Sequence, residues 1–112
     1  MVLLTDTIYS IREIPLFREK FDKIIPLNKQ RDVKNRIQKL SHNPYNGKSL
    51  GYKYLRELKI DKFRIYYIIS EKEVVVLLVT VSDKKQQQET ISFIKNHMDE
   101  LKKMIKNLNK EN

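Results

Sequence analysis

Three strand-like segments follow one another with almost no chain between them. They occupy residues 52–60, 62–70 and 73–83. The first link is one residue and the second is two, so neighbouring segments can join only as antiparallel hairpins, because a parallel connection needs a crossover of about a dozen residues. Residues 74–81 are apolar except for Thr80, which is typical of a central strand covered on both faces at least in part. The sequence therefore predicts an antiparallel meander.

Further segments with their own signals surround this meander. An imperfect alternation over residues 8–14 predicts a first strand. Pro15 suits the first turn of a helix that ends at Pro26, and Asn28 is expected to cap a second helix. Dense turn formers over residues 41–51 predict a loop. The predicted order is β-α-α-β-β-β-α, a single α+β domain of all 112 residues whose N-terminal helical hairpin packs on a mostly antiparallel sheet.

A long C-terminal helix is predicted over about residues 84–108. Asp83, followed three residues later by Gln86, resembles a capping box. Apolar residues then recur at alternating spacings of three and four, at Ile91, Ile94, Met98, Leu101, Ile105 and Leu108. This is the spacing of a coiled-coil seam. It predicts either a helix packed along its own domain or a helix that pairs with another chain.

The composition excludes several kinds of chemistry. Cysteine is absent, so there is no disulfide, no thiolate nucleophile and no Cys-based zinc site. The two histidines, His42 and His97, are far apart, and neither is assigned a role. Gly47 and Gly51 are the only glycines, which excludes a Gly-rich phosphate loop. We expect neither a metal nor a cofactor.

The formal charge is +9, from 23 Lys and Arg against 14 Asp and Glu. A positive surface on a folded body favours a polyanionic partner, most often nucleic acid. The alternative is a Lys-rich surface that is merely solvated. The longest apolar stretch is far shorter than the roughly 20 residues of a membrane-spanning helix. Residues 1–6 lack the basic flank of a signal peptide, so we expect no membrane association and a cytoplasmic protein.

Strand alternation sorts the side chains of residues 62–70 into two faces. Phe63, Ile65, Tyr67 and Ile69 form one face, which is expected to be core against the helical hairpin. Arg64 and Tyr66 lie on the other face, which is expected to be open. Tyr66 would then be free to stack on a nucleobase.

Charged residues gather around one end of this hairpin. A turn at Asp61 would place Glu57, Lys59 and Arg64 within reach of one another, and Lys84 and Lys85 emerge from the neighbouring strand beside a helix N-terminus. This set suits RNA cleavage without a metal, in which a base deprotonates the ribose 2′-OH and cations stabilise the charge on phosphorus. The alternative is that Glu57 and Arg64 form an ordinary cross-strand ion pair.

Each residue of this set has an expected role. Glu57 is the candidate base, and the planar fork of Arg64 is the candidate phosphate clamp. The three lysines add positive potential, and one of them would protonate the leaving oxygen. The residues expected to contact RNA are Lys53, Arg56, Lys62 and Tyr66. Tyr45, Tyr52 and Tyr54 with Lys48 and Lys53 form a basic and aromatic stretch that would suit nucleic acid, although tyrosine is also common in strands.

Short motifs in this order carry a family resemblance. They are Asn43-Pro44, Gly47-Lys48-Ser49-Leu50, Leu55-Arg56-Glu57-Leu58-Lys59, Lys62-Phe63-Arg64-Ile65-Tyr66-Tyr67 and Asp83-Lys84-Lys85. Together with the element order, over about residues 8–95, the sequence resembles the RelE/ParE superfamily of type II toxin–antitoxin toxins, in its RelE and HigB-like branches.

The resemblance implies a RelE-like fold and a small basic RNase that enters the ribosomal A site and cuts mRNA there. Its partners would be mRNA, the ribosome with its rRNA, and a RelB-like antitoxin in a toxin–antitoxin hetero-oligomer. Arg64 matches the family's strand arginine, and Glu57 and Lys59 match the Glu-Leu-Arg of the HigB-like branch with Lys in place of Arg. Lys84 and Lys85 match the basic pair after the last strand.

The antitoxin is expected to bind the apolar seam at Ile94, Met98, Leu101 and Ile105. The sequence also departs from the family pattern. RelE itself has lysines where this chain has Leu55 and Glu57, and a tyrosine of its C-terminal helix has no match, since Thr90 stands at about that place. These departures put the acid–base assignment in question.

Two other functions compete with the RNase. ParE-like members of the same superfamily inhibit DNA gyrase and need no RNA-cleaving cluster. A nucleic-acid-binding module without catalysis is the third reading. The charged set around Glu57 and Arg64 favours the RNase.

Overall fold

The structure is a computed structural model that describes residues 7–110. Its strands are β1 (Ser10–Glu13), β2 (Lys48–Ser49), β3 (Leu55–Ile60), β4 (Phe63–Ser70) and β5 (Val75–Asp83). Its helices are α1 (Pro15–Ile24), α2 (Leu27–Gln38), α3 (Gln87–Asn96) and α4 (Met98–Lys110), with 3-10 turns at Lys39–Ser41 and Pro44–Asn46. Residues 1–6, on which the expectation of no signal peptide was based, lie outside the described residues.

The sheet confirms the predicted meander. Within residues 7–110 five strands lie in the order β1-β5-β4-β3-β2, with β3, β4 and β5 joined as antiparallel hairpins. β1 adds to the edge of β5 in parallel. A register shift between Tyr66 and Tyr67 marks a bulge in the β4–β5 pairing. β5 is central, and the residues of its first eight positions are buried, as the apolar run predicted.

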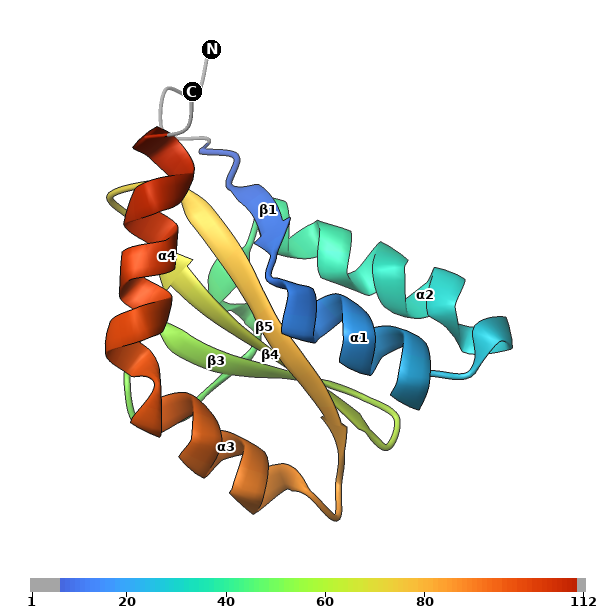
Figure 1. Cartoon of the computed structure of the whole chain (residues 1–112). Helices are drawn as coiled ribbons and strands as arrows, with labels where there is room; N and C mark the ends of the chain where they lie inside the picture. Colours follow the sequence, from blue (N-terminus) through green and yellow to red (C-terminus); the bar gives the residue numbers. More distant parts are fainter. Residues whose placement is uncertain (1–6, 111–112) are drawn as a thin grey trace, which may run out of the picture.

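The N-terminal helical hairpin covers one face of the sheet (Figure 1). Phe17 and Phe21 on α1, one turn apart, and Val33 and Ile37 on α2 turn the apolar stripes of both helices onto the strands. Pro15 occupies the first turn of α1, where its missing N–H costs nothing.

The expectation that Asn28 caps the second helix is wrong. Pro26 occupies the cap position and α2 begins at Leu27, so the restricted φ of the proline both ends α1 and opens α2. No side chain caps this end.

The C-terminal segment covers the other face of the sheet (Figure 1). The prediction of one continuous helix over residues 84–108 is wrong. The helix begins at Gln87 and is interrupted at His97, whose φ of −115° and ψ of 19° leave the helical region. The His97 N–H donates to the Ile94 carbonyl at 3.0 Å in this turn. The bend lets both halves of the apolar seam stay in contact with the twisted sheet. A straight helix of this length, at about 1.5 Å rise per residue, would extend away from the sheet.

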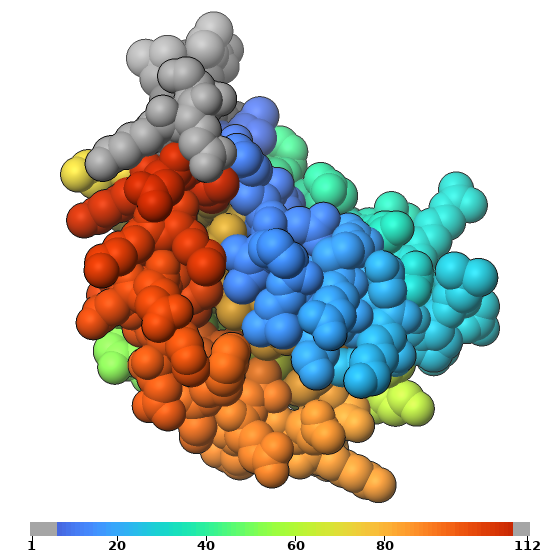
Figure 2. Space-filling view, in the orientation of Figure 1, coloured from blue at the N-terminus to red at the C-terminus, as the bar shows by residue number. Residues whose placement is uncertain are grey.

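The seam therefore packs on its own sheet. Ile94 from α3 and Met98, Leu101 and Ile105 from α4 join Leu55, Tyr66, Ile68 and strand β5 in a second core cluster. In the space-filling view, only a little of β5, whose first eight residues are buried, is visible between α4 and α1 (Figure 2). The fold is thus three layers, with the sheet covered on both faces.

The segment 41–51 is more ordered than the loop that was predicted. It begins at the end of one 3-10 turn (Lys39–Ser41) and contains a second (Pro44–Asn46) and β2. β2 is a strand of two residues at the sheet edge, where Lys48 pairs with Glu57 and Ser49 with Arg56. Among residues 7–110, no helix is both long enough and apolar enough to cross a membrane.

Candidate functional site

A charged cavity of about 450 Å³ opens where β2, β3, β4, α2 and α3 meet. The lining residues are Arg36, Asn46, Gly47, Lys48, Glu57, Leu58, Lys59, Arg64 and Gln87. We call the charged and amide side chains among them, namely Arg36, Lys48, Glu57, Lys59, Arg64 and Gln87, the Glu57–Arg64 cluster. Three of its five charged members were predicted from the sequence.

Glu57 and Arg64 are the buried centre of the cluster, each about 5% exposed. The Arg64 Nε lies 4.0 Å from the Glu57 Oε1, an ion pair at the limit of contact. The closer partner of the carboxylate is Gln87, whose Nε2 donates to the same oxygen at 2.7 Å. The first residue of α3 thereby fixes the carboxylate from the opposite side of the cavity.

The β3–β4 hairpin sets this geometry. Asp61 takes a φ of 54° in the two-residue turn, a left-handed conformation that aspartate tolerates better than most residues. The register then pairs Lys59 with Arg64 and Glu57 with Tyr66. Arg64 Nη1 donates to the carbonyls of Asp61 and Phe63, both at 3.2 Å, so the guanidinium is held against the turn.

Gly47 brings β2 against β3. A Cβ at this position would lie 2.5 Å from the Tyr67 hydroxyl oxygen and 2.7 Å from the Glu57 carbonyl oxygen, so only glycine permits the close approach. The Tyr67 hydroxyl accepts from the Gly47 N–H at 2.9 Å and donates to the Pro44 carbonyl at 2.7 Å. These contacts hold the segment that places Lys48 opposite Glu57.

Tyr66 does not stand on an open face, as the sequence led us to expect. It is fully buried beneath the C-terminal segment, and its hydroxyl is 2.8 Å from the Ser82 Oγ. Burial raises the pKa of Tyr66 to about 12, and the nearby Glu57 carboxylate acts in the same direction. A ring enclosed in this way cannot stack on a nucleobase, so we assign Tyr66 a packing role.

The other predicted residues lie apart from the cavity. Lys84 and Lys85 are exposed in the segment between β5 and α3 and do not line it. Lys62 is exposed in the β3–β4 turn, 5.7 Å from the centre of the Phe63 ring. Arg56 points to the far side of β3 and donates to the carbonyls of Gly47 at 2.8 Å and Lys53 at 2.7 Å, which gives it a structural role at the edge.

The residues predicted to bind an antitoxin are buried in this structure. Ile94, Met98, Leu101 and Ile105 are each at most 8% exposed against the chain's own sheet. Their contact with an antitoxin stays a prediction, which requires the C-terminal segment to move away from the sheet. Lys53 lies at the other end of the sheet, paired with Glu71 at 3.9 Å.

Sequence reasoning gave Arg36 and Gln87 no role, and it placed Lys48 only in the basic and aromatic stretch. Only the docking of α2 brings Arg36 to the cavity. Lys48 depends on β2, which is too short to leave a periodic pattern. Gln87 had a signal in the Asp83–Gln86 spacing, since the Asp83 Oδ1 accepts from the Gln86 N–H at 3.0 Å in the turn just before α3. Gln86 itself is the cap residue of α3 and has no side-chain cap bond.

The cluster combines four cations with one carboxylate. Arg36, Lys48, Lys59 and Arg64 surround Glu57, so the cavity carries a net positive charge and suits a phosphate group. Among the described residues no group of three or more His, Asp and Glu could hold a metal ion. A base held beside several cations can move a proton and stabilise charge on a phosphoryl oxygen.

Comparisons with known proteins identify the class of this fold. The family described as ParE toxin of type II toxin–antitoxin system, parDE, matches residues 14–88. The chain belongs to this family and is a RelE/ParE-like toxin of a type II toxin–antitoxin module. No curated protein matches the sequence significantly.

Solved structures show the same fold. The toxin–antitoxin complex RelBE2 from Mycobacterium tuberculosis contains a chain with a TM-score of 0.61 and 21% identity, over 69% of this chain and 92% of that one. A mutant of the E. coli toxin RelE in the free state has a TM-score of 0.64 and 14% identity, over 77% and 92%. The archaeal RelE–RelB complex from Pyrococcus horikoshii gives 0.59 and 14%, over 70% and 97%. These neighbours confirm the predicted RelE-like α+β fold.

Proposed function

We propose that this toxin is an endoribonuclease that cuts mRNA on the ribosome and so inhibits translation in the cytoplasm. The observation that carries the proposal is the cavity in which one buried carboxylate, Glu57, lies among four cations. An ordinary surface ion pair would be exposed and would not be oriented by a third side chain such as Gln87.

The reaction needs only groups of this chain. Glu57 removes the proton from a ribose 2′-OH, and that oxygen attacks the adjacent phosphorus. Arg64, with Arg36 and Lys48, stabilises the added negative charge on the phosphoryl oxygens. The bond from phosphorus to the 5′ oxygen breaks, and Lys59 gives a proton to that leaving oxygen. The products are a 2′,3′-cyclic phosphate and a 5′-OH end.

Lys84 and Lys85 would act at longer range in this scheme. Both are exposed ahead of α3, beyond the lining of the cavity. They would attract the RNA or rRNA backbone through charge, as Lys62 would from the adjacent turn. Their substitution should weaken RNA binding and lower its salt dependence, and should leave the chemical step nearly unchanged.

The experiment that tests this proposal maps RNA 5′ ends after the toxin is induced. A reporter message is compared with a copy that lacks its start codon. Cuts confined to the translated copy are expected, and Arg64→Ala should abolish both the cuts and the growth arrest. Arg31→Ala is the matched control, because Arg31 is exposed on α2 and does not line the cavity. Intact messages in growth-arrested cells would refute the proposal.

DNA gyrase inhibition is the second candidate, because the matching family is that of ParE toxins. A binding toxin of this kind would keep its activity in the Arg64→Ala variant. Purified chain that blocks supercoiling of relaxed plasmid, with mRNA left intact, would establish this function in place of the first.

We also propose a RelB-like antitoxin as the partner. Several structural neighbours are RelB–RelE complexes, and a chain of charge +9 suits an acidic partner. Co-expression of the cognate antitoxin should restore growth. Substituting Leu101 with Asp in the toxin should weaken that rescue if the seam is the contact, provided that the variant is still folded and toxic on its own.

A further inference from the structure

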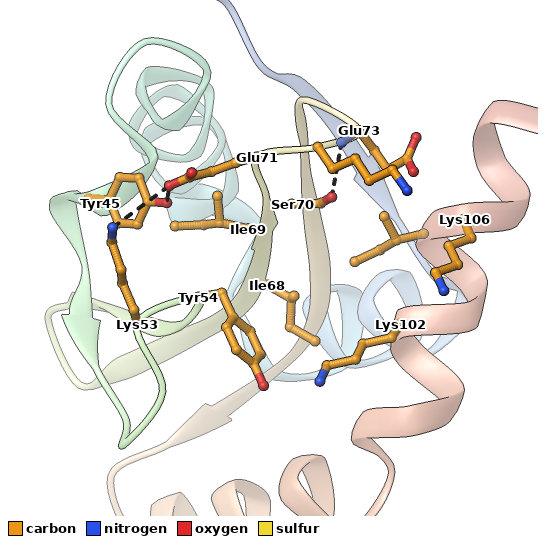
Figure 3. Close-up of a pocket in the computed structure, with 12 residues that line it drawn as sticks. Tyr45, Lys53, Tyr54, Ile68, Ile69, Ser70, Glu71, Glu73, Lys102 and Lys106 are labelled. Atoms are coloured by element: carbon orange, nitrogen blue, oxygen red, sulfur yellow. Dashed lines mark hydrogen bonds and ion pairs between the residues drawn. The ribbon is translucent and has the colours of Figure 1, made fainter.

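A second cavity lies at the opposite end of β4, beneath the turn that leads into β5. Its volume is about 420 Å³. Ile68 and Ile105 from the core beneath the C-terminal segment form its apolar floor, and Figure 3 shows polar side chains around it. We call it the Tyr54–Lys102 cavity. None of its lining residues belongs to the Glu57–Arg64 cluster.

Two tyrosine rings, Tyr54 and Tyr45, line this cavity on the side away from α4. Tyr54 lies over the floor, and its ring stacks on Tyr52 with centroids 5.4 Å apart and planes inclined by 24°. The Tyr45 hydroxyl donates to Glu71. These tyrosines, with Lys53, belong to the basic and aromatic stretch that the sequence shows, and the RNase chemistry uses none of them.

Lysines from α4 form the facing wall. Lys102 and Lys106 are four residues apart, so they lie on the same side of the helix, and both line the cavity. Lys102 reaches from α4 toward Tyr54 in Figure 3. Lys102 Nζ is 5.0 Å from the centre of the Tyr54 ring. Among the described residues neither lysine forms an ion pair, whereas Lys53 on the opposite wall is paired with Glu71. Positive charge that is not taken up by an ion pair is therefore present on the α4 side, and Lys72 in the β4–β5 turn adds a further lining cation.

We propose that the Tyr54–Lys102 cavity binds a nucleotide, with its base on the isoleucine floor against Tyr54 and its phosphate at Lys102 and Lys106. A flat apolar floor beside an aromatic ring suits a base, and two lysines one helical turn apart suit a phosphate. Ser70 and Glu71 at the rim supply hydrogen-bonding groups for the edge of the base. The ligand is either a free nucleotide or an unpaired nucleotide within RNA. This site goes beyond the proposed cleavage and does not depend on it.

Binding to an uncleavable RNA tests the proposal. The probe is a fluorescent 12-residue RNA with 2′-O-methyl groups, which cannot undergo attack by a 2′-OH, and the readout is anisotropy with the full chain. Lys102→Glu should weaken binding by about tenfold, because it replaces a cation that contacts the phosphate with a carboxylate. Lys103→Glu makes the same charge change at an exposed position of α4 outside the cavity and should weaken binding less than about twofold, by general attraction alone.

A second arm distinguishes the two sources of the ligand. If AMP competes with the RNA probe for wild type but not for Lys102→Glu, the site takes a free nucleotide. If AMP does not compete but Tyr54→Leu weakens RNA binding while Tyr54→Phe does not, the site takes a nucleotide within RNA. Equal losses for Lys102→Glu and Lys103→Glu would overturn the proposal. The proposal would also be overturned if a poly-glutamate peptide bound in a way that depends on Lys102, while the binding of RNA and AMP did not depend on Lys102.

Discussion

The two faces of β4 differ in how their polarity is distributed. On the face toward α1 and α2, Phe63, Ile65, Tyr67 and Ile69 all belong to one apolar core. On the face toward α3 and α4, the strand changes along its length. Arg64 and the Tyr66 hydroxyl contact polar groups at one end, whereas Ile68 packs among apolar side chains at the other.

The difference comes from what covers each face. The helical hairpin packs only apolar side chains, such as Phe17, Phe21, Val33 and Ile37, in the core that contains this face of the strand. The C-terminal segment places a polar residue, Gln87 at the start of α3, over one end of the strand. Over the other end it places the apolar residues Leu101 and Ile105 from α4. A buried charge is tolerated only where hydrogen-bonding partners meet it, so the amide of Gln87 allows a charged centre that the hairpin face would exclude.

The largest expected effect is the loss of RNA cleavage in Glu57→Gln, a change on the polar face that tests the chemistry and not the fold. Glu57→Gln keeps the shape of the side chain and removes the base, so RNA cleavage should fall by about 10²–10⁴-fold. The thermal unfolding midpoint of purified protein shows whether the fold survives. Cleavage that persists in a folded Glu57→Gln variant would mean that the carboxylate only balances charge.

On the other face, Ile65→Ala should act on stability alone. Ile65 is fully buried between the sheet and the hairpin, and a cavity there should cost about 2–5 kcal/mol in the free energy of unfolding. Urea denaturation measures this loss. Ile65→Val is the control, with an expected cost of about 0.5–1.5 kcal/mol.

Activity per folded molecule sharpens the contrast between these adjacent residues. It should be unchanged in Ile65→Ala and lost in Arg64→Ala. If the folded fraction of Ile65→Ala were inactive, the hairpin face would also govern the site.

Tyr67→Phe connects the apolar face to the site. The change leaves the Gly47 N–H and the Pro44 carbonyl without the phenol that now meets both. A buried donor or acceptor without a hydrogen-bond partner costs about 1–3 kcal/mol in the free energy of unfolding. The segment from Pro44 to Gly47 should also be held less firmly, which should misplace Lys48. Stability and cleavage should therefore fall together, measured by urea denaturation and by the rate per folded molecule. Loss of stability with an unchanged rate would show that Lys48 is not needed.

The sequence predicts the parts of this fold that depend on local signals. Two very short links force the meander, and alternation correctly separates Phe63 and Ile65 from Arg64. The same reasoning places Glu57, Lys59 and Arg64 at one end of a hairpin, where the structure brings them together.

What the sequence does not predict depends on long-range packing. The interruption at His97 has no proline or glycine to announce it, and it follows from the fit of two helices to a twisted sheet. The face of Tyr66 was expected to be open because no local pattern shows which side α3 and α4 cover. Arg36 and Gln87 reach the site only through the docking of their helices.

The smallest expected effect concerns protons on the polar face. Burial raises the pKa of Tyr66 to about 12, whereas an exposed tyrosine titrates near 10. Between these values the folded chain keeps a proton that the unfolded chain loses, so the stabilisation is complete below pH 10 and is lost as the pH rises toward 12. The slope is up to about 1.4 kcal/mol per pH unit for this residue. Tyr66→Phe should cost about 1 kcal/mol at pH 8 through the lost contact with Ser82, and this difference should fall between pH 10 and 12 until the Phe variant is the more stable protein. Urea midpoints of the two proteins across this range measure the effect, and parallel curves would show that the Tyr66 proton does not contribute to it.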